Sequence, residues 1–96
     1  MIVEQIKDHK DMNVSNPIRI LIVDDDPDIL ASIQDVIELE IDNCLVEIAS
    51  NVEQAISKAQ QAKPDIALLD IKIGQDSGLD LLPELKSIDS DPFDFD

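Results

Sequence analysis

Three apolar runs, each followed by an amphipathic stretch, organise the chain between residues 18 and 88. The runs at 18–23, 44–49 and 66–69 are rich in aliphatic and β-branched residues, which is typical of buried parallel strands. After each run, apolar side chains recur every three or four residues, as on the buried face of a helix. Three such strand–helix units predict a doubly wound α/β fold, with a parallel sheet in the strand order 2-1-3 and helices on both faces.

Local signals predict where the helices begin and end. Asp26 followed by Pro27 is typical of an N-cap and a first helical residue, and Ser50 with Glu53 predicts a capping box for the second helix. Pro83 predicts that the third helix begins late or bends. The buried stripe expected on the first helix consists of Leu30, Ile33, Val36, Ile37 and Ile41.

The chain of 96 residues has room for one folded domain, which we expect over residues 18–90. Residues 1–17 read as a polar tail with at most a helical turn or two, and residues 91–96 as an acidic tail. His9 stands in the first tail between charged neighbours, so we assign it no role.

Charge and cysteine content restrict the function classes. A formal charge of −15 would repel nucleic acid and anionic lipid, so we expect neither as a direct partner. Cys44 is the one cysteine of the sequence, which excludes an intramolecular disulfide and a cysteine-based metal cage. With no long apolar run in the sequence, we expect a protein of the cytoplasm.

Aspartates follow two of the predicted strands directly. Asp24 and Asp25 come after the first strand and Asp70 after the third, and the strand order would bring these positions, 46 residues apart between Asp24 and Asp70, to one end of the sheet. Like charges so close together oppose folding unless a cation compensates them, and an open carboxylate pocket suits Mg²⁺. Taken alone, residues 24–26 would more often be a helix cap, but Asp70 favours the metal site.

These residues carry a resemblance to a known family. The segment 20–30 resembles the first strand and acidic pair of response-regulator receiver domains, and 64–70 resembles their third strand with its phosphoacceptor. Gly78 stands eight residues after Asp70, as in receivers, and the similarity extends over residues 18–88. The resemblance implies a flavodoxin-like fold, of which the chain contains three of the five strand–helix units.

The resemblance also implies a function in a two-component phosphorelay. Asp70 would take a phosphoryl group from a sensor histidine kinase or a phosphotransfer protein, in a chain that is not a turnover enzyme. Mg²⁺ would be bound by Asp25, by Asp70 and by the backbone carbonyl of Lys72, with Asp24 acting mainly through water. A magnesium-dependent phosphatase is less favoured, because its second aspartate, two residues after the nucleophile, is Lys72 here.

The sequence departs from the family pattern in two places. Gly74 replaces a frequent proline, which we expect to loosen the loop. The Ser or Thr of the fourth strand and the Lys of the fifth are not in the sequence, so the receiver is expected to be truncated. The strand at 66–69 would then be a sheet edge, open to self-association. The alternative function is a phospho-inert interaction or decoy module.

Overall fold

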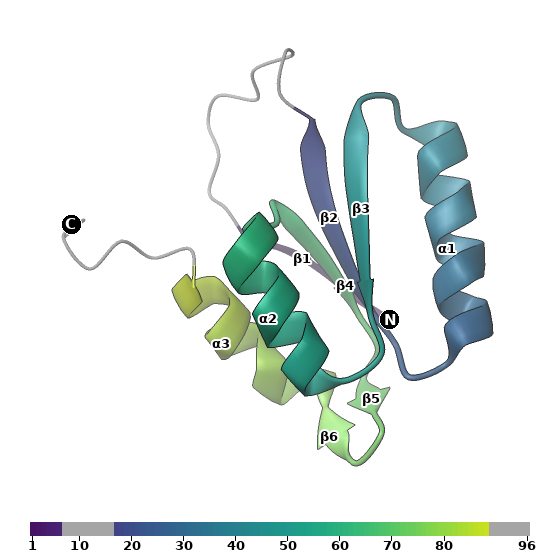
Figure 1. The fold of residues 1–96 in the computed structure, drawn as a ribbon. Helices are drawn as coiled ribbons and strands as arrows, with labels where there is room; N and C mark the ends of the chain where they lie inside the picture. The colour runs from purple at the N-terminus through teal and green to yellow at the C-terminus, as the bar shows by residue number, and fades with distance from the viewer. Residues whose placement is uncertain (7–16, 89–96) are drawn as a thin grey trace, which may run out of the picture.

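The computed structural model describes residues 1–6 and 17–88, and it has the predicted α/β architecture (Figure 1). His9 and the tail 91–96 lie outside the described residues. The four strands of the main sheet are β1 (Ile2–Gln5), β2 (Ile18–Val23), β3 (Cys44–Ala49) and β4 (Ile66–Leu69). The helices are α1 (Pro27–Glu40), α2 (Val52–Ala62) and α3 (Gly78–Ile88), and a small hairpin is formed by β5 (Lys72–Ile73) and β6 (Asp76–Ser77).

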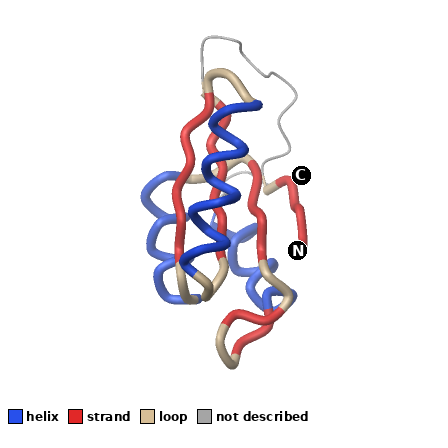
Figure 2. Tube along the Cα trace, turned by 90° about the vertical axis from the view of Figure 1, so that its right-hand side faces the viewer, coloured by secondary structure: helices blue, strands red, loops and turns tan. Residues whose placement is uncertain are grey.

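The sheet has the order β1-β4-β2-β3. Strand β2 pairs in parallel with β3 and with β4, so the three predicted strands occupy the predicted order 2-1-3 and the fold class is confirmed. Helix α1 lies on one face of the sheet, and α2 and α3 lie on the other (Figure 1). The hairpin β5–β6 projects beyond the carboxyl ends of β2 and β4 (Figure 2).

The main difference from the sequence prediction lies at the N-terminus. Residues 2–5 are not a tail or a helical turn but the strand β1, which pairs antiparallel with β4 in the register Ile2↔Leu69 to Gln5↔Ile66. The backbone N–H of Ile6 donates to the Asp65 carbonyl over 2.7 Å, and the Ile6 side chain is buried in the core. The prediction that β4 is an open edge is therefore wrong, and the proposed route to self-association through it has no basis in the described residues.

The core is divided between the two faces of the sheet. The layer below α2 and α3 joins Leu21 and Val23 of β2 to Leu69 of β4, with Leu81 and Leu85 of α3 packed over them. The layer below α1 is smaller and centres on Ile20, Ile22 and Leu30. Both layers hold β2 between them, which fixes the strand that carries the acidic pair.

Three details of the helices differ from, or narrow, the prediction. Val36 of α1 is 58% exposed, and Ile41, at the C-cap of this helix, is 36% exposed, so the buried stripe is narrower than predicted. Asn51, not Ser50, is the N-cap of α2, and its side chain accepts from the Gln54 N–H. Helix α3 begins at Gly78 and includes Pro83, so it does not begin late. None of the helices within residues 1–6 and 17–88 is long and apolar enough to cross a membrane.

Candidate phosphoacceptor and metal site

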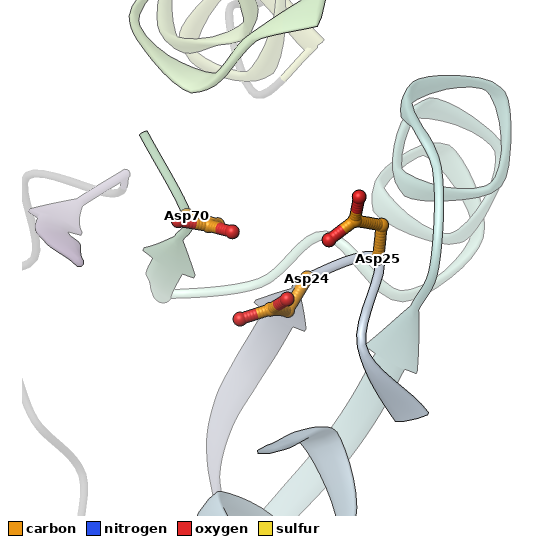
Figure 3. Close-up of side chains that lie close together, drawn as sticks. All are labelled: Asp24, Asp25 and Asp70. Carbon is orange, nitrogen blue, oxygen red and sulfur yellow. The ribbon is translucent and has the colours of Figure 1, made fainter. Parts of the chain in front are cut away.

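Three carboxylates meet at the carboxyl end of the sheet. Asp24 and Asp25 leave the end of β2, Asp70 leaves the end of β4, and one oxygen from each lies within 4.8 Å of the others. In Figure 3 the side chains of Asp25 and Asp70 turn toward one another across the space between the two strand ends. The predicted convergence of these three residues is thus what the structure shows.

Backbone hydrogen bonds set these positions by continuing the sheet past its last residues. The Asp24 N–H donates to the Ala49 carbonyl over 3.1 Å, and the Asp70 N–H donates to the Val23 carbonyl over 3.0 Å. Because the strands are parallel and in register, the residues that follow them leave the sheet at the same level. The acidic cluster is therefore a direct consequence of the strand pairing.

Asp24 is the buried member of the cluster, with 3% of its surface exposed. Burial raises its pKa, the charges of Asp70, Asp25 and Asp26 raise it further, and the hydrogen bond from the Asp26 N–H lowers it. That hydrogen bond reaches Oδ1 of Asp24 over 2.9 Å. A carboxylate with these neighbours gains much from a nearby cation, because a cation offsets both burial and like-charge repulsion.

Asp25 is exposed, and its hydrogen-bond donor lies in the hairpin that follows Asp70. Its Oδ2 accepts a hydrogen bond of 3.0 Å from the backbone N–H of Gly74, 49 residues away in the sequence. Glycine at position 74 predicts a looser loop after Asp70, whereas in the structure this loop is tied to the residues that follow β2. No periodic signal in the sequence could have shown this bond, because it joins two loops.

The backbone of Gly78 also shapes the site. A Cβ at this position would overlap the backbone carbonyl oxygen of Asp70, so only glycine fits without displacing the Asp70 backbone. The Gly78 N–H also donates to the Ile71 carbonyl over 2.7 Å and closes the base of the loop. The spacing of eight residues between Asp70 and Gly78 therefore reflects a close backbone approach.

Two lysines, Lys72 and Lys86, are less closely tied to the acidic cluster. Lys72 lies in β5, two residues after Asp70, with an exposed side chain, and metal binding by its carbonyl stays a prediction. Lys86 of α3 makes an ion pair of 3.2 Å with Glu4 of β1. Its observed role is to connect α3 to β1.

The arrangement fits a small hard cation. Ligand oxygens at 2.0–2.1 Å from one Mg²⁺ lie about 3 to 4 Å apart, and three oxygens within 4.8 Å need only a small shift or one bridging water to share it. Oxygen donors from one or two carboxylates are the protein ligands that Mg²⁺ ordinarily takes, with waters and phosphate oxygens completing its shell.

Comparison with known proteins agrees with the geometry. The response regulator receiver domain matches residues 20–93. Over 75 residues the chain is 36% identical to the protein-glutamate methylesterase/protein-glutamine glutaminase 1 of Methanospirillum hungatei and 35% identical to the nitrate/nitrite response regulator protein NarL of Escherichia coli. Over 81 residues it is 35% identical to the transcriptional regulatory protein PrrA of Mycobacterium leprae.

The matched region is most of this chain but a minor part of each relative. The alignments cover 78%, 78% and 84% of the chain and 22%, 35% and 34% of the three relatives. The similarity thus concerns the receiver portion and not the remainder of those proteins. With its family match, its parallel sheet and its acidic site at the ends of β2 and β4, the chain belongs to the response-regulator receiver domain family.

Proposed function

We propose that Asp70 accepts a phosphoryl group from a phosphohistidine of a sensor histidine kinase or a phosphotransfer protein, with Mg²⁺ bound beside it. The observation that carries the proposal is the meeting of Asp24, Asp25 and Asp70 at the point where the sheet order reverses. Asp25, Asp70 and the Lys72 carbonyl would hold the cation directly, and Asp24 mainly through water.

The chemistry is a direct displacement at phosphorus. A carboxylate oxygen of Asp70 forms a bond to the phosphorus atom while the bond from phosphorus to the donor imidazole nitrogen breaks. The electron pair of the broken bond stays on that nitrogen, and the product is an acyl phosphate on Asp70. Asp70 is half-buried, so the oxygen is accessible while its backbone is held by β2.

Phosphoryl transfer is catalysed mainly by positioning and by charge stabilisation. Mg²⁺, when bound, would supply the positive charge that neutralises the phosphoryl oxygens and the three carboxylates. The part of the protein is to hold the ligands rigidly: β2 between the two core layers, β4 between β2 and β1, and the hairpin closed at its base.

A specific observation also favours the alternative of a phospho-inert interaction module. Ile29, Val36 and Leu39 on α1 and Leu45 on β3 are large apolar side chains between 42% and 81% exposed. Such side chains are common at surfaces that contact other proteins. This reading requires no phosphorylation of Asp70, and the experiment below separates it from the phosphoacceptor function.

The test is incubation of the purified protein with acetyl phosphate and Mg²⁺, followed by mass spectrometry of the intact chain and its peptides. We expect a labile phosphoryl adduct on Asp70 that does not form when a chelator removes Mg²⁺ before acetyl phosphate is added. Asp70→Asn should abolish the adduct, because an amide keeps the shape but not the nucleophile. Asp76→Asn in the neighbouring hairpin is the matched control and should keep it.

Beryllofluoride provides a second measurement, since it binds a phosphoacceptor carboxylate without transfer chemistry. We expect its binding with Mg²⁺ to shift the amide resonances around Asp70 and Asp25. A folded protein that shows neither the adduct nor these shifts would refute the phosphoacceptor function and favour the interaction module.

A further inference from the structure

One backbone hydrogen bond connects the two halves of the acidic site. The Gly74 N–H donates to Oδ2 of Asp25 over 3.0 Å, from the hairpin that follows β4 to the loop that follows β2. Asp25 is the exposed member of the cluster, whereas Asp24 is held by burial and by the Asp26 N–H. The carboxylate that most needs an orienting partner is thus the one that receives the Gly74 amide.

The donor is part of an anchored loop. Residues Lys72↔Ser77 and Ile73↔Asp76 pair across the hairpin, and the Gly78 N–H to Ile71 carbonyl bond closes its base. The side chain of Ile73 is 2% exposed and belongs to the core layer below α2 and α3. Gly74 follows this buried residue directly, so its N–H is presented from a fixed support.

Gly74 is needed for its backbone conformation and its N–H, and not because a side chain would clash there. Gly74 has φ +62°, in the left-handed region that most residues avoid, and a Cβ built there would meet no atom within 4 Å. Asparagine tolerates this region and keeps the N–H. Proline lacks the N–H and has a fixed negative φ, so it can supply neither the conformation nor the hydrogen bond.

We propose that Gly74 is a positioning residue for the cation site, acting through Asp25. Its N–H holds Oδ2 and fixes the rotation of the Asp25 carboxylate, which is turned toward Asp70 (Figure 3), so that the carboxylate is held ready for a cation shared with Asp24 and Asp70. Hydrogen bonds to metal-binding carboxylates reduce the freedom lost on binding and set ligand orientation. This inference rests on the proposed function, since it assigns a role toward the same cation.

The decisive experiment measures Mg²⁺ affinity by isothermal titration calorimetry after removing the Gly74 N–H alone. A synthetic chain with an ester in place of the Ile73–Gly74 amide exchanges N–H for oxygen and leaves the φ of residue 74 permitted. We expect Mg²⁺ to bind about tenfold or more weakly to this protein. Gly74→Pro should weaken binding at least as much, and Gly74→Asn should stay within about threefold of the wild type.

A measurement on the metal-free protein tests the hydrogen bond itself. In the wild type the Gly74 amide proton should resonate downfield, as for a donor to a carboxylate, and Asp25→Ala should move it upfield. A merely structural role of Gly74 in the hairpin would leave this resonance unchanged in the Asp25 variant.

The outcomes separate the two proposals. A wild type that binds Mg²⁺, together with an ester protein of equal affinity, would overturn the role of Gly74 and leave the proposed function standing. The role is also overturned if Gly74→Asn binds as weakly as Gly74→Pro. Absence of Mg²⁺ binding in the folded wild type would refute the proposed function, and this inference with it.

Discussion

At the residue scale, Gly78→Ala should change the free energy of unfolding in the opposite direction from an ordinary Gly→Ala substitution in a helix. Replacing glycine by alanine inside a helix ordinarily stabilises it by about 0.5–1 kcal/mol. At Gly78 the new Cβ would overlap the Asp70 carbonyl oxygen, so we expect Gly78→Ala to lower the free energy of unfolding by about 1–3 kcal/mol instead. Urea unfolding followed by circular dichroism measures this change.

The control for this substitution is Gln75→Ala, in the exposed turn of the neighbouring hairpin, which should change stability by less than about 0.5 kcal/mol. An increase in stability for Gly78→Ala would contradict the close approach of Gly78 to the Asp70 backbone.

The acidic side chains of the site were predictable from single residues, whereas the groups that position them were not. Asp24, Asp25 and Asp70 could be predicted because they follow the ends of apolar strands, and parallel pairing brings such positions together. The hydrogen bond from Gly74 to Asp25 could not, because its geometry depends on a hairpin with no periodic signal. The metal-binding role of these residues stays a prediction.

At the element scale, the long periodic segments were predictable and the short strand was not. The bounds of β2, β3 and β4 and the start of α1 agree with the sequence, because apolar runs and the Asp26–Pro27 pair have direct physical causes. Strand β1 has four residues, and its stability comes from pairing with β4, from the buried Ile6 and from the Glu4–Lys86 ion pair. Tertiary contacts of this kind are invisible to local propensity.

A pair of substitutions tests whether β1 is docked in solution. Ile6 is buried at 9% exposure, and Val3 on the same segment is 65% exposed. We expect Ile6→Ala to lower the free energy of unfolding by about 2–4 kcal/mol, because a buried isoleucine is truncated. Val3→Ala should cost less than about 0.5 kcal/mol, since surface substitutions rarely exceed that.

Chemical denaturation of both variants against the wild type provides the measurement. Equal and negligible effects would mean that residues 1–6 behave as the tail that the sequence analysis expected, and that β4 is an open edge after all.

At the scale of the whole molecule, the fold concentrates negative charge at one end of a sheet in a chain whose formal charge is already −15. The two core layers hold β2 and β4 in place from both faces, so the three carboxylates cannot separate without disrupting the sheet. Burial raises the pKa of Asp24 most, and the charges of the neighbouring carboxylates raise it further. A cation bound at this end of the sheet, as proposed, would offset both the burial and the repulsion.

The most direct test is a titration of the isotope-labelled protein with Mn²⁺, a paramagnetic substitute for Mg²⁺ that broadens the resonances of nearby amides. We predict that the amides of Asp25, Asp70 and Lys72 broaden first and together, although Asp25 and Asp70 lie in separate segments of the chain. Broadening that begins at the exposed acidic face of α1, at Asp35 and Glu38, or that does not single out the ends of β2 and β4, would contradict the proposed site.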